Sequence, residues 1–433
     1  MSPHYVILGS GVAGISAAEA IRSTGDNGQI TLISDDPHGY YSRPGLAYYL
    51  TGEITRQFLF PWQTSEFGRL DLRIMAASVA SLDPAAHTLA LTDGRTVAYD
   101  RLLLATGSQA VQPALPGMDL PQVVKLDNME DADGIIRMAR KAKAAVVVGG
   151  GITALEIVEG LRAHCRRVHY LLRGARYWSN VLDEVESHAV LHHLARQGIE
   201  IHTGVEIASV EEKRGRVAGI LTTDGARIPC DLVAVAIGVA PRADLARAAG
   251  LRVDRGVLVD ETLRTSAADI FAAGDVAQVF DPRTGVSLLD TLWNIARSQG
   301  TVAGQNMAGG RIAYHKPVPF NVTRLAGLTT TIIGSVGRGQ DPDLVGIARG
   351  DSEAWRRLDT ALVAEDSFEV NRLRLLVGAN TLVGAVVMGD QRPSRPLQKL
   401  ISQQVDISPI RARLLEPGAP LADLLIDFAD RCP

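Results

Sequence analysis

The sequence predicts an α/β protein with two dinucleotide-binding (Rossmann-like) domains and a smaller C-terminal α+β domain. Two glycine-rich turns carry the main part of this prediction: VILGSGVAG, with Gly9, Gly11 and Gly14, and VVVGGGITA, with Gly149, Gly151 and Ala154. Each turn follows a run of apolar β-forming residues and precedes a helix-forming stretch, as in a βαβ unit. Two turns of one design predict two bound dinucleotides, with electrons passing between them.

The residue types in these turns have physical reasons. The first glycine permits a tight bend, the second lets the backbone approach a pyrophosphate, and the third position must be small so that the helix packs on the strand. The helix N-terminus adds a partial positive charge that favours phosphate. Asp35 and Asp36 end the second strand of the first unit, where an acidic residue can accept hydrogen bonds from a ribose. A turn aspartate before Pro37 is the alternative interpretation.

Length and composition predict an ordinary globular enzyme. The 433 residues suffice for two or three domains, and 46% hydrophobic with 21% charged residues is typical of an α/β protein. A net charge of −4 argues against a general nucleic-acid binder. No apolar run reaches the ~18 residues of a membrane span. The first strand is expected at Tyr5 to Leu8, so we expect no signal peptide and a cytoplasmic location.

The cysteines predict no thiol chemistry. Cys165, Cys230 and Cys432 are far apart and form no C-x-x-C pair that could hold a cluster or cycle as a disulfide. Electrons are therefore expected to leave this chain from a bound organic cofactor.

Three further segments complete the predicted organisation. YDRLLLATG, from Tyr99 to Gly107, is a buried strand that ends in a turn of small residues. IFAAGDVA places Asp275 on a Gly-Asp turn after an apolar strand, where a carboxylate can bind a polyol hydroxyl. From His315 onward, strand-like runs alternate with the helical segment RPLQKLISQQ, which predicts the α+β domain.

The order of GSGVAGISAAEAIR, YDRLLLATG, GGGITALE and IFAAGDVA resembles the FAD- and NAD(P)-dependent pyridine nucleotide reductases of the glutathione-reductase-like superfamily, over roughly residues 1–310. YYSRPGLAYYL and LWNIARSQGTVAGQNMAG are similar to segments of NADH-dependent rubredoxin and ferredoxin reductases. LVGAVVMGDQRPSRPLQKLI resembles the end of the flavin region of the assimilatory nitrite reductase large subunit. The resemblance implies an FAD-binding domain at 1–115 and 243–314, an NAD(P)-binding domain at 116–242 and an interface domain at 315–433.

The resemblance also implies the FAD-binding residues. Gly9, Ser10, Gly11 and Gly14 would hold the pyrophosphate, and Asp36 or Asp35 the adenosine ribose. Asp275, after Gly274, would bind the ribityl chain. Other implied contacts around the adenine and the flavin come from Val79, Arg43, Pro44, Ala105, Thr106, Gly107 and Trp293. Packing is the alternative interpretation for Trp293. Arg43 is also a candidate for setting the electrostatics of the reduced flavin.

In the second unit the resemblance implies that Gly149, Gly151, Ile152 and Ala154 receive the nicotinamide dinucleotide, with Gly238 in a turn beside it. Glu156 would project toward the nicotinamide where hydride passes to the flavin. A first-turn glutamate favoured by the helix dipole is the alternative interpretation of Glu156.

Four positions depart from the family pattern, one of which is Tyr48 or its neighbour, where many ferredoxin reductases carry a lysine near the flavin. Pro44 stands where disulfide reductases and NADH oxidases carry a catalytic cysteine, and Arg242 replaces an asparagine beside the nicotinamide. Leu172 occupies the place of the acidic residue that favours NADH, and Arg173, with Arg176 nearby, could accept the 2′-phosphate of NADPH. The choice between NADH and NADPH stays open.

The leading hypothesis is an NAD(P)H-dependent FAD oxidoreductase that passes electrons to a separate redox protein, ferredoxin- or rubredoxin-like, or to a partner subunit. A reductase of a quinone, oxygen or another small acceptor and a flavoprotein subunit with mainly an assembly role are the alternatives. No nucleic-acid partner is expected, and a homo-oligomer is possible. C-terminal arginines are interpreted as a solvated face, or alternatively as a docking surface: Arg372, Arg374, Arg392, Arg395, Arg411 and Arg413. No metal is assigned, including at His188, His192 and His193.

Overall fold

The computed structural model describes residues 2–62, 64–282, 284–337, 347, 349–356, 361–368 and 371–432. The chain forms two compact units. The first contains Met1–Ala110, Asp127–Glu130 and Val239–Lys316, and the second contains Val111–Leu126, Asp131–Gly238 and Pro317–Pro433.

The first unit is built on a five-stranded parallel sheet. Its strand order is β19 (Ile270–Ala272), β7 (Arg101–Leu104), β1 (His4–Leu8), β2 (Gln29–Ser34) and β3 (Leu72–Ala76). The central strands are buried and almost entirely apolar, as expected of a parallel sheet covered on both faces. Because parallel strands end at one edge, the turns that follow β1, β7 and β19 meet there.

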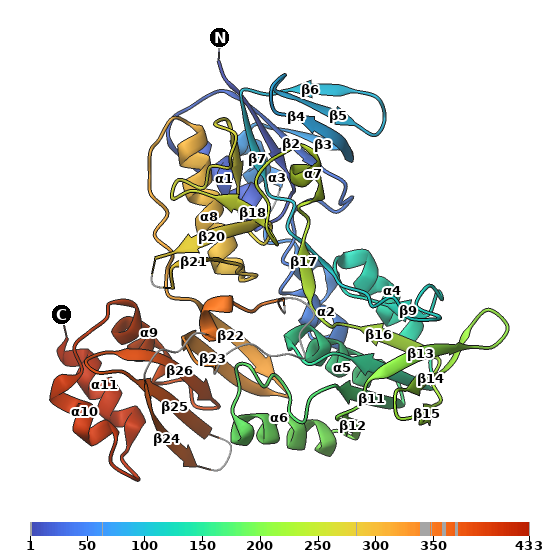
Figure 1. The fold of residues 1–433 in the computed structure, drawn as a ribbon, viewed down its shortest axis with the longest axis vertical. Coiled ribbons are helices and arrows are strands. Elements are labelled where there is room, and N and C mark those ends of the chain that lie inside the picture. The colour runs from blue at the N-terminus through green and yellow to red at the C-terminus, as the bar shows by residue number, and fades with distance from the viewer. Residues whose placement is uncertain are drawn as a thin grey trace. The chain divides into compact units, whose positions relative to one another are not determined.

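Helices α1 (Val12–Ser23) and α8 (Trp293–Met307) pack side by side on this sheet (Figure 1). A Cβ added at Gly300 would lie 2.2 Å from the Ala13 carbonyl oxygen, and one at Gly304 would lie 2.3 Å from that of Ala17. Glycine at these two positions therefore lets the helix backbones approach closely, which fixes α8 against the first glycine turn.

Shorter elements complete the first unit. One small antiparallel sheet consists of β4 (Val79–Asp83), β5 (Thr88–Leu91) and β6 (Thr96–Ala98). A second consists of β18 (Val257–Val259), β20 (Ala277–Asp281) and β21 (Val286–Leu288), in which β18 is parallel to β20. Strand β8 (Ser108–Ala110) pairs in the antiparallel direction with β17 (Val239–Pro241). The short helices are α2 (Leu46–Thr51), η1 (Arg56–Leu59), α3 (Thr64–Leu70) and α7 (Asp244–Ala248).

The second unit contains another five-stranded parallel sheet. Its order is β12 (Ile199–Thr203), β11 (Arg167–Leu172), β10 (Ala144–Val148), β16 (Leu232–Val235) and β9 (Val123–Val124). Antiparallel strands β13 (Ile207–Glu212), β14 (Val217–Thr222) and β15 (Arg227–Ile228) form a second core with one face of it. The associated helices are α4 (Met129–Ala139), which begins in the first unit, α5 (Ile152–His164) and α6 (Glu184–Arg196).

The C-terminal part of the second unit is an antiparallel sheet with helices on one face, as the sequence predicts. The strand order is β22 (Phe320–Leu325), β23 (Leu328–Gly334), β26 (Leu382–Met388), β25 (Asn371–Val377) and β24 (Leu362–Phe368). Figure 1 shows the helices beside these strands: α9 (Ser394–Ser402), α10 (Ser408–Leu414) and α11 (Leu421–Arg431). A short helix, η2 (Glu353–Arg356), precedes β24.

The face of β25 that points away from the C-terminal helices carries two buried arginines, Arg372 and Arg374. The interpretation of these two residues as part of a solvated face or a docking surface is therefore wrong. Arg372 and Arg374 are 9% and 6% exposed. Arg374 makes a bidentate pair with Glu186 of α6, with nitrogen–oxygen distances of 2.8 and 3.0 Å. Arg372 donates to Asp183, the N-cap of α6, at 2.5 Å. Both side chains therefore bind the nucleotide-domain helix α6 and are closed to a partner.

Candidate dinucleotide sites

The first glycine turn has the geometry that a pyrophosphate requires. Gly9 has a φ of +113°, and a Cβ there would lie 2.2 Å from the Ala105 carbonyl oxygen. A Cβ on Gly14 would lie 2.1 Å from the carbonyl oxygen of Gly9. Around Gly11, in contrast, no described atom lies within 4 Å of such a Cβ. Gly9 and Gly14 therefore serve the packing of the turn, whereas Gly11 leaves open space for a ligand.

The starts of α1 and α5 fit an anionic group. Gly11 and Gly151 are their N-caps, no described side chain caps either helix, and neither first turn contains an acidic residue. Helix α6 differs, since Asp183 and Glu186 form a complete capping box at its start. The first N–H groups of α1 and α5 thus remain for a phosphate.

The candidate ribose aspartates have different surroundings. Asp36 accepts hydrogen bonds from the Tyr41 hydroxyl at 3.1 Å and from Arg43 at 3.3 Å, and it also accepts from the His38 amide. Asp35 is exposed directly after β2. Asp36 is thus held by neighbouring side chains, whereas the carboxylate of Asp35 is open to solvent.

Arg43 and Ser10 also have clear structural partners. The guanidinium of Arg43 donates to the Asp127 carbonyl oxygen at 2.7 Å and lies 5.3 Å from the centroid of the Tyr41 ring. Ser10 is buried, and its hydroxyl contacts Ser34 and the Gly39 carbonyl oxygen. Any contact of Ser10 with a pyrophosphate would therefore come from its backbone.

Asp275 lies at the edge where the turns after β1, β7 and β19 meet. Gly274 has a φ of +79°, and its amide donates to the side chain of Gln299 at 2.8 Å. The hydroxyl of Ser108 donates to the Asp275 carboxylate at 2.6 Å. The structure thus brings the Gly9 turn, the segment Ala105–Gly107 and Asp275 together, as the resemblance implies for FAD.

Two residues in this arrangement are absent from the sequence prediction. Gln299 belongs to the helix motif quoted above, so its position carried a signal, and its buried amide holds the Gly274 turn. Ser108 follows a small-residue turn and gave no signal of its own. Its bond to Asp275 joins residues 167 positions apart in the chain.

The other predicted flavin-side residues, Val79, Pro44 and Trp293, also lie in the first unit. Val79 begins β4 and packs partly against the core. Pro44 is exposed before α2. Trp293 begins α8 and is 40% exposed. The guanidinium carbon of Arg297 lies 5.7 Å from the centroid of the Trp293 ring. This exposure disfavours core packing as the role of Trp293.

Thr106, Gly107 and Arg242 form a backbone junction. The Thr106 hydroxyl donates to the Arg242 carbonyl oxygen at 3.0 Å, and the Arg242 amide donates to the Gly107 carbonyl oxygen at 2.9 Å. Both bonds involve only the backbone of Arg242. The replacement of asparagine by arginine here therefore leaves this junction intact.

The second glycine turn repeats the design of the first. Gly149 has a φ of +148°, and a Cβ there would lie 2.1 Å from the Ala236 carbonyl oxygen and 3.0 Å from the Cβ of Ala154. Any side chain at position 149 would therefore collide with the turn and with Ala154. Ile152 is buried at the start of α5, and Gly238, with a φ of +133°, follows β16.

Glu156 projects from the first turns of α5 into an environment that disfavours its charge. Burial raises its pKa to about 8, Arg349 opposes this, and Glu159 adds to it. Arg349 donates to the Leu126 carbonyl oxygen at 3.0 Å and brings the C-terminal segment to the nucleotide domain. The pKa of Glu156 is therefore raised well above that of an ordinary glutamate, which favours the protonated form that can donate a hydrogen bond.

The residues that would distinguish NADH from NADPH lie at the end of β11 and directly after it. Leu172 is buried, and its side chain has no polar group to offer a ribose. The guanidinium of Arg173 lies 3.7 Å from Glu206, and Arg176 is exposed. Arg173 thus has a carboxylate partner in Glu206.

The thiols are poor nucleophiles. Cys165 and Cys230 are buried, and burial raises the pKa of Cys230 to about 12 and that of Cys165 above its usual value. Because the thiolate is the reactive form, neither cysteine is activated for redox chemistry.

Two parallel sheets, each with a glycine turn and an uncapped helix after a central strand, define a protein with two dinucleotide-binding folds. The chain belongs to the pyridine nucleotide-disulphide oxidoreductase family, whose sequence model matches residues 3–300. Membership confirms the predicted family resemblance, the two-domain α/β fold, the oxidoreductase class and the cofactors, FAD and a nicotinamide dinucleotide.

Relatives match along nearly the whole chain. The ferredoxin–NAD(+) reductase component of the biphenyl dioxygenase system of Paraburkholderia xenovorans (strain LB400) is 31% identical over 97% of both chains. The rubredoxin–NAD(+) reductase of Pseudomonas putida is 30% identical over 76% of this chain and 86% of its own. The solved putidaredoxin reductase–putidaredoxin complex shares the fold, with a TM-score of 0.85, 24% identity and 99% coverage of both chains. No helix among the described residues is long and apolar enough to cross a membrane.

Proposed function

We propose that this chain oxidises NADH, uses FAD as its resident cofactor and delivers the electrons to a separate iron–sulfur protein of the ferredoxin or rubredoxin kind, or to a partner subunit. The observation that carries this proposal is the 97% coverage of both chains in the match to a ferredoxin–NAD(+) reductase, which includes the C-terminal domain. Bound FAD supplies the conversion between two-electron hydride transfer and one-electron transfer.

The residues of the first unit fit the binding of FAD. The open space at Gly11 and the uncapped start of α1 would receive the pyrophosphate, and Asp275 would hold the ribityl hydroxyls. Ala105, Thr106 and Gly107 would line the same edge. We assign this role to residues 1–115 and 243–314, and the nicotinamide dinucleotide to residues 116–242.

NADH is proposed as the donor over NADPH. The names of the relatives specify NAD(+), and Glu206 lies close to Arg173, the residue best placed to bind a 2′-phosphate. Glu156, in its protonated form, would orient the nicotinamide by donating a hydrogen bond. The raised thiol pKa values support an exit of electrons through the flavin alone.

Anaerobic titration tests the proposed function. We expect one equivalent of NADH to bleach the flavin absorbance. NADPH should reduce the flavin at a rate at least about tenfold lower. A ferredoxin or rubredoxin from the host should then reoxidise the flavin within the enzyme's turnover time. Fast reoxidation by a quinone without any protein acceptor would favour the small-acceptor alternative. Flavin that stays oxidised under both nucleotides would refute the proposal in favour of an assembly role.

Glu156→Ala is expected to slow flavin reduction by NADH by roughly 10- to 100-fold while FAD stays bound, because the nicotinamide loses an orienting hydrogen bond. Glu156→Gln should keep most of the rate, since an amide imitates the protonated carboxyl. Stopped-flow absorbance measures both, with Glu159→Ala as the control on the same helix.

The pH dependence separates orientation from mere packing. With a raised pKa of about 8, wild-type Glu156 is protonated below that pH and ionises above it. The reduction rate should therefore fall above about pH 8 in the wild type and remain level in Glu156→Gln. An unchanged rate in Glu156→Ala would return Glu156 to a helix-dipole role.

A further inference from the structure

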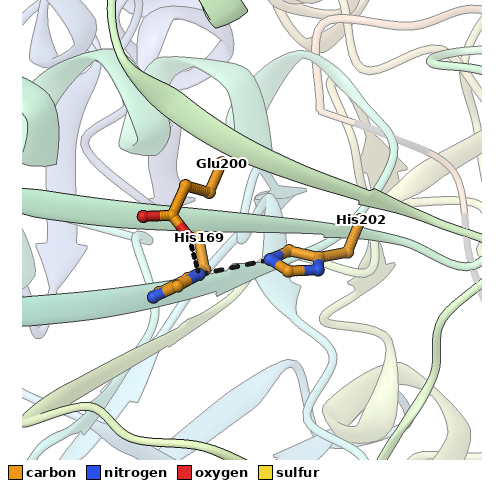
Figure 2. Close-up of side chains that lie close together, drawn as sticks. All are labelled: His169, Glu200 and His202. Carbon is orange, nitrogen blue, oxygen red and sulfur yellow. Dashed lines mark hydrogen bonds and ion pairs between the residues drawn. The ribbon is translucent and has the colours of Figure 1, made fainter.

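Three side chains with metal-binding atoms gather on one face of the second parallel sheet. β11 and the edge strand β12 are neighbours, with His169 opposite Glu200 and Leu171 opposite His202. Since side chains two positions apart in a strand share a face, all three point to the same side. Figure 2 shows them directed toward one another.

Their separations match the coordination geometry of zinc. The Nδ1 atom of His169 lies 3.2 Å from Nε2 of His202 and 3.3 Å from a carboxylate oxygen of Glu200. Ligand atoms about 2.0–2.1 Å from a tetrahedral Zn²⁺ are about 3.3 Å apart. All three ligand atoms lie within 4.8 Å of one another, so a small rotation of His202 or Glu200 closes the set.

We propose that His169, Glu200 and His202 bind one divalent transition-metal ion, of which Zn²⁺ is the expected species. Two imidazole nitrogens and one carboxylate oxygen form a donor set that suits Zn²⁺ and disfavours Mg²⁺ and Ca²⁺, which prefer oxygen. A fourth position would be taken by water, because Glu200 is exposed and His202 partly so.

The surroundings prepare these ligands. Arg167 lies 3.3 Å from one carboxylate oxygen of Glu200, which directs the other oxygen toward His169. Such an outer contact fixes the orientation of a ligand.

The proposal departs from the sequence prediction of no metal site. That prediction considered His188, His192 and His193, which lie on α6. His169 and His202 are 33 residues apart, so only the pairing of β11 with β12 brings His169 to the two ligands on β12. An ion held by β11 and β12 would join the edge strand to the sheet and stabilise the folded nucleotide domain. It does not depend on the proposed function.

Zinc titration of the full-length, chelator-treated flavoprotein tests the site. With zinc sulfate as the probe and a chromogenic chelator as competitor, we expect one tight site per chain and a higher midpoint of thermal unfolding. His202→Gln and Glu200→Gln should each weaken zinc binding by at least about tenfold and abolish the thermal shift. Flavin reduction by NADH should be unchanged in both variants.

The double variant His188→Ala/His192→Ala is the matched control, because it removes an exposed histidine pair on α6 whose rings lie 6.3 Å apart. This variant should bind zinc like the wild type. Zinc binding that survives His202→Gln, or that is lost in the α6 variant, would overturn the assignment. So would the absence of any tight site in the wild type.

Discussion

Asp275→Ala is expected to purify with little or no FAD. The carboxylate lies where the turns after three parallel strands meet, and its position is fixed by Ser108 and, through Gly274, by Gln299. A hydrogen bond to a charged group contributes about 1.5–3 kcal/mol, so the loss of one to the ribityl chain should weaken FAD binding by roughly 10- to 100-fold or more. The ratio of flavin to protein absorbance in the purified protein measures the occupancy.

Asp269→Ala is the control for this variant. Asp269 immediately precedes β19, so it lies at the opposite end of the same strand, where it pairs with Arg101 at 2.5 Å. This variant should retain FAD if only the aspartate after the carboxyl end of β19 contacts the cofactor. Full occupancy in Asp275→Ala would remove Asp275 from the FAD site, and loss of FAD in both variants would indicate general damage to the sheet.

The parts of the fold that the sequence predicts are those encoded within short segments. The turns at Gly9 and Gly149 were recognisable because positive φ and the close approach of a carbonyl oxygen admit only glycine. Asp275 was recognisable because its turn directly follows an apolar strand. In each case the relevant contacts lie within a few residues or at the known edge of a parallel sheet.

Other features depend on pairings between distant segments, and these gave no local signal. The sequence predicts that the arginines of β25 are exposed, because a charged residue that alternates with leucine is typical of a half-exposed strand. Their acidic partners on α6 lie almost 190 residues earlier. Arg349 beside Glu156 is a similar case, since the charge balance of the nucleotide domain includes a residue from the C-terminal segment.

Arg374→Ala is expected to destabilise the second unit by about 3–5 kcal/mol, the usual result of removing one partner of a buried ion pair. Glu186 is fully buried, and burial raises its pKa while Arg374 opposes this. Without the guanidinium, Glu186 would lose its bidentate partner and the Val336 and Val181 carbonyl oxygens would lose a donor. Urea unfolding followed by circular dichroism measures the change.

The pH dependence and two further variants identify the cause. A carboxyl whose folded pKa is raised costs stability as pH rises through that value, so Arg374→Ala should be more damaging at pH 8 than at pH 5. Adding Glu186→Gln should recover part of the loss, because no buried charge remains. Arg392→Ala breaks an exposed pair with Asp390 on the same domain and should cost far less stability than Arg374→Ala. If Arg374→Ala costs no more than Arg392→Ala, the pair between β25 and α6 does not hold the C-terminal sheet to the nucleotide domain.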